Sequence, residues 1–138
     1  MMYDEMMIAP MRRELTELGI QETRTPEDVE RIMQDAKGTT LMVVNSVCGC
    51  AAANARPGVA FALQHGKKPD QALTVFAGND KEATAKARSY MVGYQPSSPS
   101  IALFKDGELV FMLERYQIAG RDAEDIGKEL MSALEEHA

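Results

Sequence analysis

A nearly continuous run of apolar and β-branched residues, Thr40 to Asn45, constrains the fold more than any other part of this 138-residue sequence. A strand exposed on one face alternates apolar with polar side chains, whereas a strand covered on both faces shows an unbroken apolar run. The segment therefore predicts an interior strand of a sheet that carries helices on both faces. An alanine-rich helical pattern follows from Ala51 to Gln64, and Pro57 is expected to kink or split that helix.

Helical and strand patterns alternate along the rest of the chain. Helices are expected over Met6–Leu18, from Pro26 up to Gly38, over Asp80–Met91 and over Asp122–Glu136, and strands over Ala72–Phe76, Ile101–Lys105 and Glu108–Leu113. We expect the Asp80 side chain to cap its helix and Asp106-Gly107 to form a two-residue hairpin turn. This order predicts an α/β, thioredoxin-like fold, with a central mixed four-stranded sheet, helices on both faces, additional N-terminal helices and a single domain over residues 1–138.

Composition and charge narrow the classes of function. Hydrophobic residues make up 45% and charged residues 26% of the chain, which is typical of a globular protein rather than a disordered one. The net charge of −6 argues against nucleic acid as a partner, because phosphate binding requires clustered lysine and arginine. No apolar run approaches the roughly 20 residues that cross a bilayer, and the acidic N-terminus is unlike a secretory signal. We therefore expect no membrane partner and a cytoplasmic location.

The sequence contains two cysteines, Cys48 and Cys50, separated only by Gly49. A disulfide between them would close a loop of one residue and would hardly restrain the unfolded chain, so we expect the pair to serve chemistry. The pair lies between a buried strand and a helix, where backbone N–H groups at the helix start favour a thiolate. We predict that Cys48 is the exposed nucleophile, activated mainly by the helix start unless the fold brings Arg56 or another cation near.

Cys50 is predicted to be the resolving thiol, which displaces an adduct from Cys48. Gly49 is expected to supply the backbone freedom that closure of so small a ring requires. A simpler interpretation is that the cysteines are two packed thiols, since cysteine is a good small hydrophobe. A third is a soft-metal site for copper or zinc with His65 or His137 as further ligands, although neither histidine has ligand-like spacing and no metal is assigned.

Pro99, which follows Ser98, is the second candidate for a functional role. A proline directly before a strand is often a trans residue that merely starts the strand. A cis proline would instead turn the backbone of Ser98 toward the cysteines and offer a short edge to an incoming peptide or thiol adduct. The residues alone leave both states open.

Several motifs occur together: NSVCGCAA at 45–52, PSSPS at 96–100, PMRREL at 10–15, ARP at 55–57 and DKEATAK at 80–86. In combination they resemble the bacilliredoxins, a family within the thioredoxin superfamily, over nearly the whole chain. The resemblance implies a cytosolic thiol-disulfide oxidoreductase that removes bacillithiol from S-bacillithiolated proteins, with bacillithiol as co-substrate and no bound cofactor. A general protein disulfide isomerase that uses the same residues is the alternative.

The resemblance also implies roles for individual residues. Cys48 would attack the mixed disulfide and take bacillithiol onto itself, and Cys50 or a second bacillithiol would clear it. Pro99 would be the cis-proline of the superfamily, and Asn45, Gly49 and Ser98 would border the substrate. The sequence leaves the oligomeric state open.

Overall fold

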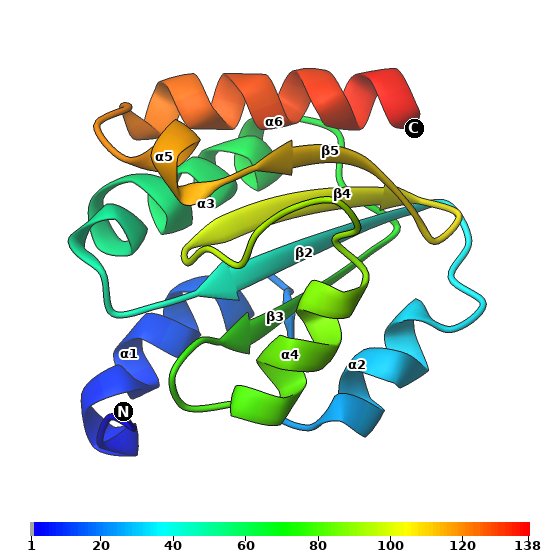
Figure 1. Cartoon of the computed structure of the whole chain (residues 1–138). Helices are drawn as coiled ribbons and strands as arrows, with labels where there is room; N and C mark the ends of the chain where they lie inside the picture. The colour runs from blue at the N-terminus through cyan, green and yellow to red at the C-terminus, as the bar shows by residue number, and fades with distance from the viewer. Residues whose placement is uncertain (1) are drawn as a thin grey trace.

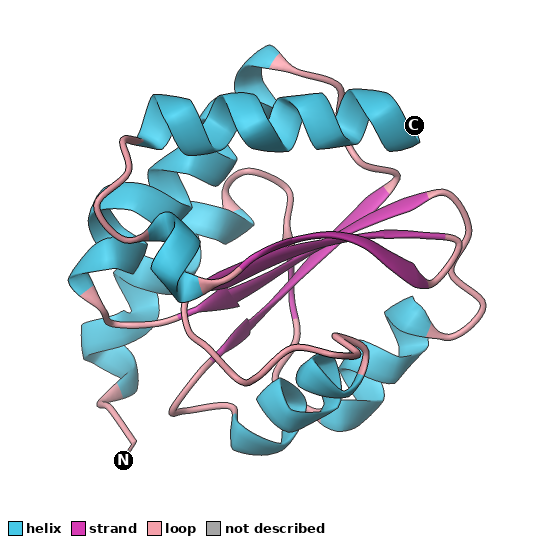
Figure 2. Ribbon diagram, turned by 45° about the horizontal axis from the view of Figure 1, so that its top comes forward, coloured by secondary structure: helices cyan, strands magenta, loops and turns pink. Residues whose placement is uncertain are grey.

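A five-stranded sheet lies between two layers of helices in the computed structural model, which describes residues 2–138 (Figures 1 and 2). The elements are, in chain order, α1 (Glu5–Thr16), β1 (Gln21–Glu22), α2 (Pro26–Met33), β2 (Thr39–Asn45), the π-helical turn η1 (Ala51–Ala55), α3 (Arg56–His65), β3 (Gln71–Phe76), α4 (Lys81–Ser89), β4 (Ser100–Lys105), β5 (Glu108–Leu113), α5 (Arg115–Ile118) and α6 (Ala123–His137). Among these residues, no helix has both the length and the apolar character needed to span a bilayer.

The strands lie in the order β1-β3-β2-β4-β5. Strands β1, β3 and β2 run parallel, whereas β4 is antiparallel to β2 and β5 is antiparallel to β4. Every residue of β2 is buried, which confirms the predicted interior strand. The sheet has five strands rather than the four predicted, because the two-residue strand β1 pairs with β3 and is too short to show a period-two pattern.

Alternate residues of β2 pack into different hydrophobic layers. Leu41 and Val43 belong to the layer formed with α3 and α6, while Met42 and Val44 belong to the layer formed with α2 and α4. Figure 2 shows the two helical layers on opposite sides of the sheet. This double coverage explains why the sequence of β2 is apolar throughout, since a period-two strand presents alternate side chains to each face.

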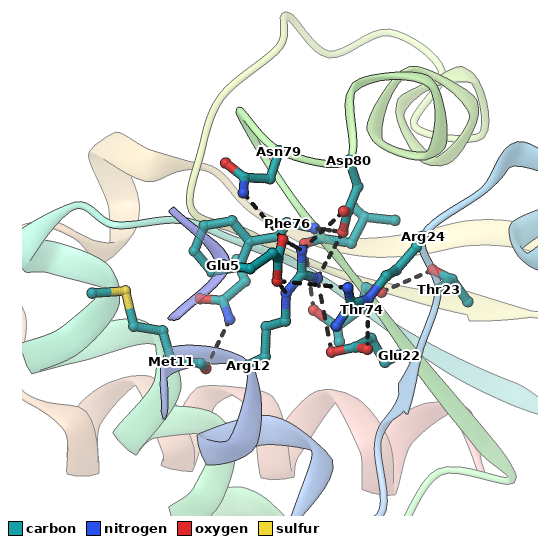
Figure 3. Close-up of polar contacts among 12 residues, drawn as sticks. Glu5, Met11, Arg12, Glu22, Thr23, Arg24, Thr74, Phe76, Asn79 and Asp80 are labelled. Atoms are coloured by element: carbon teal, nitrogen blue, oxygen red, sulfur yellow. Dashed lines mark hydrogen bonds and ion pairs between the residues drawn. The ribbon is translucent and has the colours of Figure 1, made fainter. Parts of the chain in front are cut away.

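Arg12 and Asp80 form a buried ion pair that joins α1 to the start of α4 (Figure 3). The Nη1 and Nη2 atoms of Arg12 donate to the two carboxylate oxygens of Asp80 at 2.8 and 2.9 Å, and Glu5 accepts from the same guanidinium. The predicted side-chain cap by Asp80 is therefore wrong, because its carboxylate accepts from Arg12 and from the Phe76 amide at 3.1 Å instead. The contact holds α1 against the loop that follows β3.

Two local predictions are confirmed, one for the hairpin between β4 and β5 and one for the helix after the cysteines. Asp106 and Gly107 both have positive φ angles, 50° and 83°, as a two-residue hairpin turn between β4 and β5 requires. The helix after the cysteines is split, as predicted, into η1 and α3, with Pro57 in the first turn of α3. The wider π-helical turn precedes the proline, whose missing N–H removes one regular helical hydrogen bond.

Candidate functional site

Cys48 and Cys50 lie immediately after β2, where the chain turns into a helical segment. The Cys48 carbonyl accepts hydrogen bonds from the amides of Ala51 and Ala52 at 2.9 and 3.2 Å, so the first helical bonds begin at the cysteine itself. Both cysteines are free and half-buried, and their sulfur atoms lie 2.7 Å apart. The two thiols are therefore close enough for one to donate a hydrogen bond to the other.

Cys48 lines a cleft of about 430 Å³ at the carboxyl ends of β2 and β3. The walls come from the loop after β2 (Ser46, Val47, Cys48), the loop after β3 (Ala77, Gly78), the N-terminal Tyr3, and Ser98 with Arg115. This is the edge of an open α/β sheet at which ligands commonly bind. Cys48 thus borders a cleft rather than being enclosed in the core, which argues against two merely packed thiols.

The Ser98–Pro99 peptide bond is cis, as the family resemblance implied. Pro99 is buried, whereas Ser98 is half-buried and lines the cleft together with Cys48. The carbonyl of Ser98 accepts a hydrogen bond from Nη1 of Arg115 at 3.4 Å. The structure therefore brings together Cys48 and the segment before the proline, which are 50 residues apart in the sequence.

The two thiols differ in acidity because they occupy different positions in one hydrogen-bonded pair. The pKa of Cys48 is lowered, first by the hydrogen bond from the Cys50 thiol and further by the amides of Cys50 and Ala51 and the charge of Arg115, although burial opposes this. The pKa of Cys50 is raised, first by burial and then by its interaction with Cys48. Cys48 is therefore the thiol that ionises first, as a nucleophile should.

The source of this acidity differs in part from the sequence prediction. The helix start contributes through its amides, as expected, but the Cys50 thiol is the larger contributor. The cation that acts on Cys48 is Arg115 rather than Arg56. Arg56 is buried and instead forms an ion pair with Glu14 at 3.0 Å.

Asn45 and Arg56 form buried hydrogen bonds that hold the loop carrying the cysteines. Arg56 Nη1 donates to the side-chain oxygen of Asn45 at 2.9 Å and to the Ser46 carbonyl at 3.0 Å. Asn45 is 1% exposed, and its amide nitrogen donates to the Met11 carbonyl. These bonds place Asn45 against the loop, and Asn45 is not among the residues that line the cleft, so its predicted place beside the substrate stays a prediction. The hydroxyl of Ser46 accepts from the Cys48 amide at 3.2 Å and completes the support.

Gly49 is exposed, has helical backbone geometry and is not among the residues that line the cleft. Its φ angle is not positive, and a Cβ atom added to it would meet no atom within 4 Å. In this dithiol form, neither the backbone conformation nor the surrounding space requires glycine. The predicted contribution of Gly49 to ring closure stays a prediction about the oxidised form.

Among residues 2–138, no group of three or more potential ligands is arranged to hold a metal ion. His65 stacks edge-on against Phe61, with ring centroids 4.4 Å apart. His137 lies on the last turn of α6, 3.9 Å from the carboxylate of Glu136. Within the described part of the chain, neither histidine therefore joins the two cysteines in a group of three possible ligands.

Tyr3 and Arg115 are among the cleft residues that the sequence interpretation missed. Tyr3 is positioned by Asn79, whose side chain exchanges two hydrogen bonds of 2.8 Å with the Tyr3 backbone. Arg115 begins the short helix α5, which was not predicted because four residues are too few for a helical period. No sequence signal links either residue to the cysteines, since both reach the cleft only through the tertiary fold.

Comparison with known proteins gives a consistent result over almost the whole chain. The family model described as "Disulphide isomerase" matches residues 3–138. A bacilliredoxin of Halalkalibacterium halodurans is 53% identical over 135 residues, covering 98% of this chain and 94% of the relative. A bacilliredoxin of Bacillus licheniformis is 52% identical over 136 residues, again covering 98% of this chain and 94% of the relative.

Solved structures establish the fold. The thioredoxin of Fasciola hepatica superimposes with a TM-score of 0.59 at 19% identity, covering 86% of this chain and 100% of that chain. Mitochondrial thioredoxin 3 of Saccharomyces cerevisiae gives a TM-score of 0.54 at 13% identity, covering 86% of this chain and 95% of that chain. The predicted thioredoxin-like architecture is therefore confirmed, with one strand more than expected.

Proposed function

This chain belongs to the bacilliredoxin family of thioredoxin-fold thiol-disulfide oxidoreductases, and from that premise we propose that it removes bacillithiol from S-bacillithiolated cytoplasmic proteins. Cys48 acts as the nucleophile and Cys50 as the resolving thiol. Bacillithiol is a co-substrate, and no bound cofactor takes part. The observation that carries the proposal is a cysteine of lowered pKa, beside a second thiol of raised pKa, in a cleft next to a cis-proline loop.

The first step transfers bacillithiol from the target protein to the enzyme. The Cys48 thiolate attacks the bacillithiol sulfur, a bond forms between these two sulfurs, and the bond between bacillithiol and the target cysteine breaks. The target cysteine leaves as a thiolate and takes up a proton from water. Attack at neutral pH requires that Cys48 be ionised, which the Cys50 thiol, the helix-start amides and Arg115 all favour.

The second step releases bacillithiol. Cys50 loses its proton, its sulfur attacks the Cys48 sulfur, and bacillithiol leaves as a thiolate while a Cys48–Cys50 disulfide forms. Burial raises the pKa of Cys50, and so does its interaction with Cys48, but the second contribution is lost once Cys48 carries an adduct rather than a charge. Cys50 thus ionises more easily at the stage that needs it. Two further thiols, oxidised to a disulfide, return the pair to the dithiol state.

Intact-mass spectrometry after mixing the enzyme with a bacillithiolated protein tests the proposal. Cys50→Ala should accumulate one bacillithiol adduct on Cys48 while the substrate loses its own, because the resolving thiol is missing. Cys48→Ala should leave the substrate bacillithiolated. An unmodified Cys48 in Cys50→Ala, together with an unchanged substrate, would overturn the proposal.

A second candidate function, general disulfide isomerisation, is favoured by the description of the matching family model. It would use the same Cys48 thiolate on a protein disulfide instead of a mixed disulfide with a small thiol. Scrambled ribonuclease and a bacillithiolated protein, offered to the same enzyme preparation, separate the two functions. Faster reactivation of ribonuclease than removal of bacillithiol would assign the protein to isomerisation.

A further inference from the structure

Arg115 differs from most arginines of the chain in having no acidic partner. Arg12, Arg24, Arg31, Arg56 and Arg121 each lie within 4.0 Å of a carboxylate. Within residues 2–138, no such ion pair involves Arg115, although the chain carries 21 acidic residues. An arginine left unpaired on so acidic a protein has its charge available for a ligand.

The position of Arg115 directs that charge into the cleft. Of the residues that line the cleft with Cys48, Arg115 alone is charged at neutral pH. Its backbone amide donates to the hydroxyl of Ser97 and its Nη1 to the carbonyl of Ser98, both at 3.4 Å. These bonds fix the base and one edge of the side chain beside the cis-proline loop. The remaining N–H groups of the exposed guanidinium are free to bind a carboxylate in a two-pronged contact.

Resting on the proposed function, we infer that Arg115 is a specificity-determining residue, which selects mixed disulfides whose small-thiol half carries a negatively charged group. The group bonded to the Cys48 sulfur during exchange occupies the cleft that Arg115 borders. A carboxylate on that group would meet the cleft's own cation, whereas an ammonium group would be repelled by it. Arg115 also favours the Cys48 thiolate, so selection by charge must be separated from a general effect on reactivity.

A charge series of small thiols makes that separation. One target peptide is prepared as its mixed disulfide with 3-mercaptopropionate, 2-mercaptoethanol or cysteamine, which have similar two-carbon chains and carry a negative, no and a positive charge. The rate of adduct formation on Cys48 is measured at low substrate concentration in the Cys50→Ala background. Each rate is divided by the rate of iodoacetamide alkylation of the same variant, which removes differences in thiolate fraction.

In the protein with Arg115 present, the normalised rate should fall in the order anionic, neutral, cationic. Arg115→Gln should reduce the ratio of anionic to cationic rates by about two- to fivefold, as expected for loss of an exposed charge pair. Arg115→Lys should retain most of the ratio, and Arg115→Glu should reverse its order. Arg31→Gln changes an exposed arginine on α2 that does not line the cleft; it is the matched control and should leave the ratio unchanged.

Two results would overturn the inference while leaving the proposed function intact. The first is an equal ratio in the parent and in Arg115→Gln, with adducts still forming on Cys48. The second is a uniform loss of rate for all three substrates that disappears on normalisation, because Arg115 would then act only through the ionisation of Cys48. A different result would refute the proposed function itself: Cys48 stays unmodified with all three substrates and with bacillithiolated protein.

Discussion

Replacing Asp80 with Asn should destabilise the protein by removing the buried partner of Arg12. The side chains of Arg12 and Asp80 are 5% and 6% exposed, and two hydrogen bonds of 2.8 and 2.9 Å join them (Figure 3). Breaking a buried ion pair by removing one partner typically costs about 3–5 kcal/mol, because the remaining charge is left in a medium that solvates it poorly. Asparagine keeps the size of the side chain, so the loss of charge is the main change.

Because Arg12 keeps its contact with Glu5, we expect a loss of stability at the lower end of this range. Glu5 still accepts from Arg12 at 2.9 Å in the variant, but its side chain is 49% exposed, so water screens most of that contact. We therefore expect the free energy of unfolding to fall by about 3 kcal/mol. With a urea dependence of about 2 kcal/mol per molar, the unfolding midpoint should fall by about 1.5 M.

Urea denaturation followed by circular dichroism measures this change. Glu124→Gln is the matched control, since it breaks the exposed Glu124–Lys128 pair of α6 and should cost less than about 1 kcal/mol. Arg12→Met with Asp80→Asn should be less destabilised than the sum of the single variants, because the double variant leaves no unpaired buried charge. An Asp80→Asn midpoint equal to that of the control, or strict additivity in the double variant, would refute the reasoning.

Three further predictions concern the cysteine loop and the helix packing behind it. The pH midpoint of Cys48 alkylation should rise in Cys50→Ala, which removes the main cause of the lowered pKa, and should stay nearer the native midpoint in Cys50→Ser, which keeps a donor. Arg56→Met should lower the free energy of unfolding by about 1–3 kcal/mol and slow Cys48 alkylation, since the Ser46 carbonyl loses its donor and the Asn45 side-chain oxygen keeps only the Ser46 amide; Arg56→Lys should recover part of both losses. Gly127→Ala should cost about 1–3 kcal/mol by urea denaturation, because the added Cβ would lie 2.6 Å from the Phe61 ring.

Each of these predictions has a contrary outcome. Equal alkylation midpoints in Cys50→Ala and Cys50→Ser would mean that hydrogen bonding by residue 50 does not set the acidity of Cys48. Native alkylation rates in a destabilised Arg56→Met would restrict Arg56 to a structural role. Gly49→Ala, whose Cβ would meet no atom within 4 Å, is the control for Gly127→Ala, and an equal loss of stability in both would contradict the packing argument.

Local patterns in the sequence determined the order of the longer helices and strands, the buried central strand and the hairpin at Asp106-Gly107. These features follow from side-chain periodicity and turn preferences, which act between residues close in the chain. Strand β1 was not predicted because its two residues are extended through pairing with β3, and a two-residue segment has no side-chain pattern of its own. Asp80 occupies the N-cap position of α4 as predicted, but its side chain does not cap the helix because it pairs with Arg12, 68 residues away in the sequence.

The sequence alone also located Cys48 and Cys50 at a strand-to-helix junction, because neighbouring segments fix that position. Only the tertiary structure decided what surrounds the sulfurs: Arg115 in the cleft, Arg56 and Asn45 beneath the loop, and Tyr3 held by Asn79. Acidity and charge in a cleft depend on groups within a few ångströms in space, whatever their separation along the chain. A cation from the start of α5 acts on a thiol in the loop after β2 because the fold brings both to one edge of the sheet.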